Sequence, residues 1–81
     1  MGIVEVRALG GHRLFIRFED DLAGELDFSE FLDFRGVFAG LRDPARFAEV
    51  RVVADWGTIA WPNGADLDPD VLHERVMLAH R

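Results

Sequence analysis

The segment from residue 56 to residue 70, WGTIAWPNGADLDPD, constrains the fold more than any other part of the chain. Its residues 58–61 combine β-branched and aromatic side chains, which favour a strand. Residues 62–64 (Pro-Asn-Gly) end that strand, because proline lacks an N–H and Asn-Gly tolerates positive φ. Residues 68–70 (Asp-Pro-Asp) resemble a helix N-cap followed by proline at the first helical position. The segment therefore predicts a turn, a strand, a second turn and a helix start in succession.

Three segments of alternating polarity come before it, and each predicts a half-buried strand. They are residues 3–9, 13–18 and 22–28. Gly10-Gly11 is a two-residue hairpin signal, and a short polar turn follows the second segment. Short turns predict an antiparallel meander. The apolar residues expected on the inner face of its first strand are Val4, Val6 and Ala8.

The alternation breaks after residue 28. Ser29 is expected to cap a short helix that ends near Phe34, and Asp43 to cap one helical turn that begins at Pro44. Residues 49–55 then predict a fourth strand, joined as a hairpin to residues 58–61.

A helix is predicted from Pro69 to about His80, because apolar residues recur at helical spacing. Its apolar stripe consists of Leu72, Val76 and Ala79, widened by Val71 and Leu78. The expected fold is a single α+β domain spanning residues 1–81. It is a small antiparallel five-stranded sheet of two hairpin units, with the C-terminal helix packed on one face, which would otherwise be bare and apolar.

Charge and residue usage exclude several classes of function. The net charge is −6, from fifteen acidic residues against nine arginines, with no lysine. Phosphate backbones repel such a chain, so direct nucleic-acid binding is not expected, whereas a basic partner fits. There is no cysteine, which removes thiolate chemistry and zinc–sulfur sites. No apolar run approaches the ~18 residues that span a bilayer, and no signal peptide is visible, so a cytoplasmic protein without a membrane partner is expected.

Two motifs resemble metal sites, but each lacks a residue that its site requires. Asp66, Asp68 and Asp70 form D-x-D-x-D, yet an EF-hand loop that starts at Asp66 would need glycine and glutamate where Val71 and Met77 stand. Met77 also replaces the second histidine of an H-E-x-x-H zinc motif that begins at residue 73. No metal or other cofactor is expected.

The only candidate nucleophiles for catalysis are the hydroxyl groups of Ser29 and Thr58, and neither residue lies in a G-x-S-x-G turn. The absence of lysine also removes P-loop chemistry. The chain is therefore expected not to be an enzyme.

The two tryptophans are the best candidates for a role beyond folding. Trp61 alternates with Ile59, which favours core packing. Trp56 stands at a turn, where it can be an exposed contact for a partner or fold back over the hairpin. The candidate partner-binding residues are Trp56, Trp61, Asn63 and Asp66.

Two runs carry a resemblance to a known family. The sequence from Gly57 to Leu72 has the pattern G-T-I-x-W-P-N-G-A-D-L-x-P-D-x-L, and that from Phe38 to Phe47 has F-x-x-L-x-D-P-x-x-F. Both resemble the bacterial family catalogued as domain of unknown function 2442, and the likeness covers nearly the whole chain. It implies an α+β fold, no established catalytic residues, and a small companion protein as in toxin–antitoxin pairs. Asp21 departs from the pattern, since the family often has glycine there.

These observations predict a non-catalytic protein–protein interaction module, the antitoxin-like partner in a small bacterial protein pair. Its partner would be another small, basic protein, and an open sheet edge would also permit a homo-oligomer. The alternative is a small-ligand-binding or regulatory sensor domain, which would need a concave pocket near Trp61 and Asn63.

Overall fold

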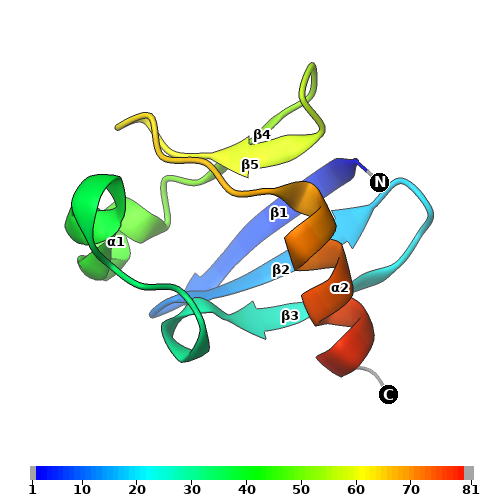
Figure 1. Cartoon of the computed structure of the whole chain (residues 1–81), viewed down its shortest axis with the longest axis horizontal. Helices are drawn as coiled ribbons and strands as arrows, with labels where there is room; N and C mark the ends of the chain where they lie inside the picture. The colour runs from blue at the N-terminus through cyan, green and yellow to red at the C-terminus, as the bar shows by residue number, and fades with distance from the viewer. Residues whose placement is uncertain (1, 80–81) are drawn as a thin grey trace.

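The computed structural model describes residues 2–79 (Figure 1). The chain begins with three strands, β1 (Ile3–Gly10), β2 (Arg13–Phe18) and β3 (Ala23–Asp27). A connector follows with two 3₁₀ helices, η1 (Phe28–Glu30) and η2 (Gly36–Arg42), and one helical turn, α1 (Pro44–Phe47). The hairpin strands β4 (Arg51–Val53) and β5 (Thr58–Ala60) and the helix α2 (Pro69–Ala79) come last.

The strands are all antiparallel, which confirms the α+β class, and they form two sheets, β1-β2-β3 and β4-β5. The sheets meet where the N–H of Ile3 donates to the carbonyl of Gly57 at 2.8 Å. Gly57 has a φ of +64°, and a Cβ on it would lie only 3.0 Å from the Cα of Gly2. Glycine is therefore required at this junction, both for its backbone angle and for the close approach.

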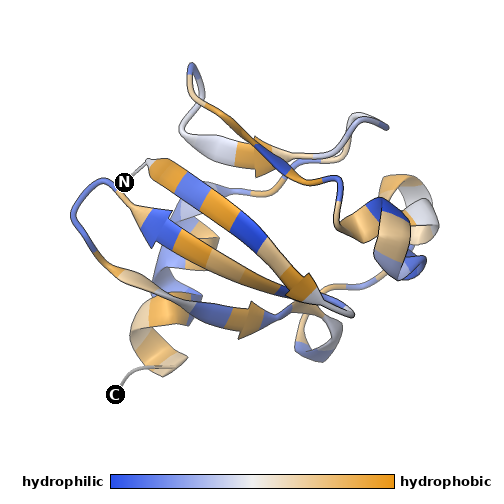
Figure 2. Ribbon diagram, turned by 180° about the vertical axis from the view of Figure 1, so that it is seen from behind, coloured by the Kyte–Doolittle hydropathy of each residue, from blue (hydrophilic) through white to orange (hydrophobic). Residues whose placement is uncertain are grey.

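The inner face of β1 differs from the prediction because the strand contains a bulge. The register shifts between Ile3 and Glu5, so that Ile3 pairs with Phe18 and Val6 pairs with Ile16. The extra residue, Val4, is 45% exposed while Ile3 is buried. The expectation that Val4 faces inward was wrong, as was that for Ala8, which is exposed on this edge strand. Figure 2 shows hydrophilic and hydrophobic residues alternating along the meander.

The first hairpin turn lies one residue later than predicted. Gly10 still pairs with Arg13, so the two turn residues are Gly11 and His12. A second register shift, between Ala8 and Gly10, accounts for the displacement. Gly10 and Gly11 both have positive φ, which glycine adopts without strain.

In the connector, the cap of η1 is Asp27 and not Ser29. The Oδ1 atom of Asp27 accepts from the backbone N–H of Ser29 at 3.0 Å and from its hydroxyl at 2.6 Å. The predicted helix from Ser29 to Phe34 is thus replaced by a shorter 3₁₀ turn. The cap of α1 is as predicted, since Asp43 accepts from the N–H of Ala45 at 3.0 Å.

Helix α2 begins at Pro69 as predicted, with Asp68 accepting from the N–H of Asp70 at 2.9 Å. Leu72 and Val76 are buried in the core. The other residues assigned to the apolar stripe are exposed, namely Val71, Leu78 and Ala79. The predicted end at His80 lies outside the described residues. The helix therefore buries a narrower stripe than its sequence suggests, and leaves a second apolar stripe on the surface.

The core lies between the inner face of the meander, the β4-β5 hairpin, the connector and α2 (Figure 1). Its largest fully buried side chains are Trp61, Phe18, Phe28 and Phe47. Strands β4 and β5 are shorter than the predicted ranges 49–55 and 58–61. The turn between them takes up residues 54–57, the N–H groups of Glu49 and Val50 donate back to α1, and that of Trp61 donates to the carbonyl of Ala65 in the next turn.

Candidate interaction surfaces

Trp61 is a core residue. Its side chain is 1% exposed, and its indole Nε1–H donates to the carbonyl of Phe47 at 2.8 Å. Its ring centroid lies 5.4 Å from that of Phe47 and 6.3 Å from that of Phe38. The side chain thus joins β5 to the connector and offers almost no surface to a partner.

Asn63 and Asp66 lie on the surface close to Trp61 in the chain. The side-chain amide of Asn63 donates to the carbonyl of Val37 at 2.9 Å, and its Oδ1 accepts from the N–H of Ala65 at 3.1 Å. Asp66 is exposed and forms an isolated antiparallel bridge with Ala60. Asn63 therefore holds η2 against the turn after β5, which is a structural task.

Trp56 is 70% exposed on the turn between β4 and β5. Figure 1 shows this turn projecting from the body of the molecule. The Trp56 ring stacks on no other aromatic ring within residues 2–79. Of the two arrangements that the sequence allowed, the exposed one is present. The structure thus separates the four candidates: Trp56 and Asp66 are exposed, while Trp61 and Asn63 make hydrogen bonds that hold the fold.

A hollow of about 270 Å³ lies beside Trp61 and Asn63. Its other lining residues are Gly40, Leu41, Arg46, Glu49 and Pro62. This is the position at which a small-ligand domain was expected to have a pocket. Its volume is slightly below the ~300–1,000 Å³ that is usual for small-molecule sites.

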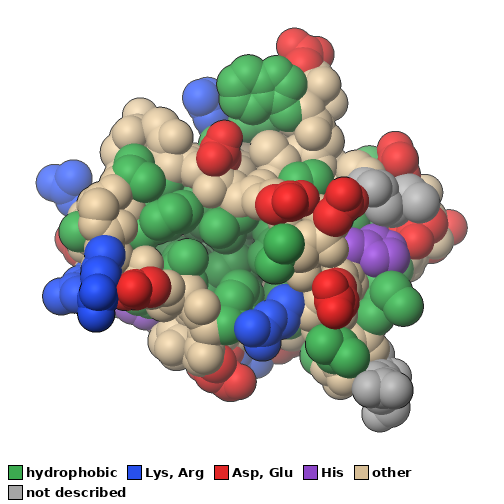
Figure 3. Space-filling model, viewed as in Figure 1, with side chains coloured by type: hydrophobic (Ala, Val, Ile, Leu, Met, Phe, Trp, Pro, Cys, Tyr) green, Lys and Arg blue, Asp and Glu red, His purple; other side chains and the backbone are tan. Residues whose placement is uncertain are grey.

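A second concave region, which we call the α2 groove, lies between α2 and the connector and was not predicted. It consists of two hollows, of about 230 Å³ and about 340 Å³, and Phe31 lines both. The smaller hollow is also lined by Leu32, Leu67, Asp68, Val71 and Leu72. The larger is also lined by Glu25, Leu26, Asp27, Glu30, Arg75, Leu78 and Ala79. Figure 3 shows hydrophobic side chains gathered in a hollow on this face, with carboxylates around it.

Arg75 lines the larger hollow, with its guanidinium carbon 4.6 Å from the centre of the Phe31 ring. This contact is a cation–π interaction. With Val71 and Leu78, Arg75 forms an exposed stripe on α2 at spacings of four and three residues. The sequence signal for the groove was the presence of Val71 and Leu78 outside the stripe that α2 buries, which consists of Leu72 and Val76.

A hydrogen bond between side chains joins α2 to the turn after β2. His73 Nε2 lies 2.9 Å from Asp20 Oδ2, and the His73 ring stands edge-on to Phe18 at 4.7 Å. The pKa of Asp20 is lowered, most by the hydrogen bond from His73 and next by the hydrogen bond from the N–H of Leu22. A carboxylate accepts in this contact, so the Nε2 atom of His73 carries the proton.

Across residues 2–79, no group of three or more His, Asp or Glu side chains is arranged to hold a metal ion. Asp66, Asp68 and Asp70 therefore do not form such a group. None of the described helices combines the length and the apolar character needed to cross a membrane.

Comparison with known proteins gives one match. The family model described as "Protein of unknown function (DUF2442)" matches residues 3–77. No curated protein and no solved structure matches the chain.

Proposed function

This chain belongs to the DUF2442 family of proteins of unknown function, and from that premise we propose that it is a non-catalytic protein–protein interaction module of the cytoplasm. In this proposal it is the antitoxin-like member of a pair and binds another small, basic protein. The single observation that carries the proposal is the exposure of Trp56.

Exposure of this size is unusual for an aromatic side chain in this structure. Each described phenylalanine is buried or half-buried, and Trp61 is buried, whereas Trp56 is 70% exposed. A tryptophan brings a large contact area that is costly to leave in water, and tryptophan is enriched among residues that dominate binding energy. The turn that carries it is short and closed by hydrogen bonds, including one of 2.9 Å from Gly57 N–H to the Val53 carbonyl. Trp56 is therefore held outward by a closed turn, an arrangement that suits an anchor.

The charge of the chain supports the basic nature of the partner. A net charge of −6 on 81 residues attracts a cationic protein and speeds its association at low salt. The same charge opposes direct contact with nucleic acid.

A pull-down from native cell lysate at low salt tests this proposal. The wild-type chain should recover one specific small basic protein, and Trp56→Ala should lose most of it, since truncating a dominant contact costs about 2 kcal/mol or more. Val37→Ala is the matched control, because Val37 is also exposed, at 49%, but lies on η2. Equal recovery by wild type and Trp56→Ala would overturn the role of Trp56. Recovery of nothing above background at low salt, where acidic–basic pairs are strongest, would overturn the proposal.

A second candidate function is supported by the hollow of about 270 Å³ beside Trp61 and Asn63. Arg46 and Glu49 line it and could orient a small polar ligand. A thermal-shift screen of small metabolites tests this candidate, because a ligand at 100 times its dissociation constant adds ~2.7 kcal/mol of stability. A stabilising compound whose effect is lost in Arg46→Ala and kept in Trp56→Ala would favour the sensor function.

A further inference from the structure

The outer edge of β3 has backbone groups that no neighbouring strand uses. The N–H of Phe28 donates to the His12 carbonyl at 2.8 Å, and the carbonyl of Leu22 accepts from Phe18 at 2.8 Å. Even-numbered residues of this segment therefore face β2. Since successive residues of a strand turn their backbone groups to opposite sides, those of Ala23 and Glu25 point away from β2. Within residues 2–79, these two residues make no backbone hydrogen bond to another segment.

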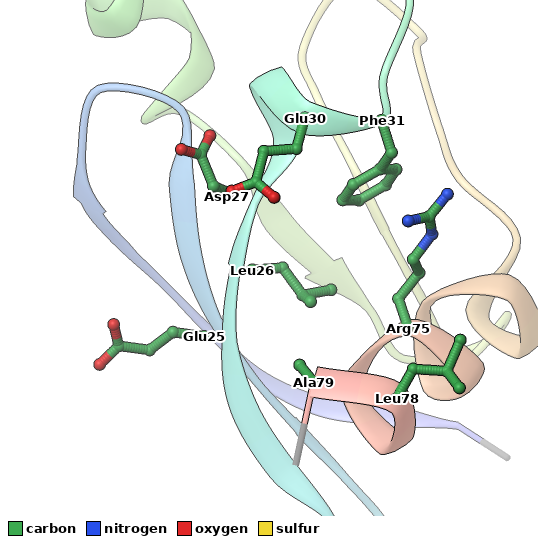
Figure 4. A pocket seen from close by; sticks show the side chains of 8 residues that line it. All are labelled: Glu25, Leu26, Asp27, Glu30, Phe31, Arg75, Leu78 and Ala79. Carbon is green, nitrogen blue, oxygen red and sulfur yellow. The ribbon is translucent and has the colours of Figure 1, made fainter. Parts of the chain in front are cut away.

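The larger hollow of the α2 groove, about 340 Å³, lies at this edge. Three consecutive residues that end β3, 25–27, line one side of it, and Leu78 and Ala79 of α2 line the other. Figure 4 shows Leu26 directed into the space between β3 and α2, with Phe31 and Arg75 at one end. The edge therefore has apolar surface beside its free backbone groups, which is the combination that strand addition requires.

The charge at this edge is mostly negative. Of the residues within 2–79 that line the hollow, Glu25, Asp27 and Glu30 are acidic, and the one cation, Arg75, is engaged with the Phe31 ring. Glu25 is also paired with Arg13 of β2, whose Nη2 lies 2.5 Å from Glu25 Oε1, so a basic segment would share this carboxylate with Arg13. We propose that the outer edge of β3 accepts an extended basic segment of the partner protein as an added strand. This proposal rests on the proposed function and states how the partner is recognised.

Strand geometry gives the pattern of the bound segment. Leu26 is buried on the inner face of the sheet, while Glu25 is exposed on the outer face. Side chains of an added strand alternate in the same way. Those beside Leu26 would be apolar and fill the hollow, and those beside Glu25 and Asp27 would be lysine or arginine. The segment is short, because β3 has only five residues.

A second copy of this chain fits the edge poorly. If two β3 strands paired antiparallel about Glu25, the two Glu25 carboxylates would lie opposite each other. Like charges directly opposite are destabilising in an antiparallel pair. Two chains of charge −6 would also repel each other before contact. The occupant is therefore a basic partner.

The probe for this proposal is a peptide with blocked ends and the sequence Lys-Val-Lys-Val-Lys, added to the full ¹⁵N-labelled chain. The largest amide shift changes should occur at Ala23 and Glu25, and binding should weaken as salt increases. One control peptide is Glu-Val-Glu-Val-Glu, and the other is the lysine peptide with methylated backbone nitrogens. Absence of binding by the lysine peptide at millimolar concentration would overturn the proposal. So would equal binding of either control, or shift changes confined to other parts of the chain.

Variants locate the site on the protein. Ala23→Pro removes a donor that faces away from β2, so the native ladder is kept, and it should weaken peptide binding about tenfold. Glu30→Lys, at an exposed position, should weaken it by a similar factor, and serves if the proline variant does not fold. Unchanged binding in a folded Ala23→Pro or in Glu30→Lys would contradict the proposed site.

Trp56→Ala separates this inference from the proposed function, because Trp56 lies outside the residues that line the groove. The variant should keep peptide binding unchanged. If the peptide fails to bind while lysate capture depends on Trp56, the strand-addition inference is wrong and the interaction function stands. If the peptide binds at β3 and Trp56→Ala changes nothing in the lysate experiment, the role of Trp56 is wrong instead.

Discussion

Trp61 gives the most demanding test of the fold, because one side chain provides both packing and a buried hydrogen bond. Replacing Trp61 with Ala removes a side chain that is 1% exposed and leaves a large cavity, which costs roughly 3–5 kcal/mol. The change also removes the donor to the Phe47 carbonyl, and an unsatisfied buried acceptor costs about 1–3 kcal/mol. We therefore expect a loss near the upper end of the cavity range.

A loss of this size is large against the total stability. An 81-residue domain has a free energy of unfolding of roughly 4–12 kcal/mol, at 0.05–0.15 kcal/mol per residue. Trp61→Ala can thus leave the chain largely unfolded. Trp61→Phe keeps an aromatic ring against Phe47 and loses mainly the hydrogen bond, so it should cost about 2–3 kcal/mol.

Urea unfolding followed by far-ultraviolet circular dichroism measures both variants without relying on tryptophan fluorescence. Trp56→Ala is the matched control and should change the free energy of unfolding by no more than about 0.5 kcal/mol, as for other surface changes. A loss below about 1 kcal/mol in Trp61→Ala would refute the buried position of Trp61 and the energetic argument built on it.

Three further predictions concern single aspartates. Asp68→Ala should lower the free energy of unfolding by about 1 kcal/mol in urea unfolding through the lost cap of α2; Asp43→Ala, which uncaps the four-residue α1, should cost less, and the reverse order would contradict this reasoning. Asp21 has a φ of +69°, so Asp21→Gly should stabilise the chain by roughly 0.5–1 kcal/mol in the same assay, and a destabilised variant would argue against backbone strain there. Because His73 lowers the pKa of Asp20, the stability that Asp20 contributes is complete above its ordinary unfolded pKa of about 3.9 and is lost as the pH falls through the lowered folded value. His73→Ala should raise the pKa of Asp20 toward its ordinary value in an NMR titration, whereas an unchanged pKa would show that the pair does not form in solution.

The parts of the fold that follow local rules could be predicted from the sequence. The caps formed by Asp43 and Asp68 each involve an N–H only two residues away, so their side chains and the following prolines are sufficient signals. The third strand was also predicted, because alternation over residues 22–28 persists without a bulge. The family resemblance, confirmed by the match over residues 3–77, agrees with this fold class.

The parts that depend on distant residues could not be predicted. The bulge in β1 accompanies a hydrogen bond between Ile3 and Gly57, which are far apart in the sequence. Likewise, Asn63 is fixed by a carbonyl 26 residues away, that of Val37. The α2 groove was missed because it depends on where the connector places Phe31. The exposure of Trp56 was left open because its turn permits both arrangements.

The order of the elements along the chain has a consequence for synthesis on the ribosome. The inner face of the meander, with Leu14, Ile16 and Phe18, is complete once β3 has been made, yet its cover includes α2 residues as late as Val76. At a synthesis rate of 5–20 residues per second, the residues between the end of β3 and Val76 take roughly 2–10 s to be added. During that interval the nascent chain presents a row of uncovered apolar side chains. We expect the newly made protein to be a chaperone client, although the finished domain is small and acidic.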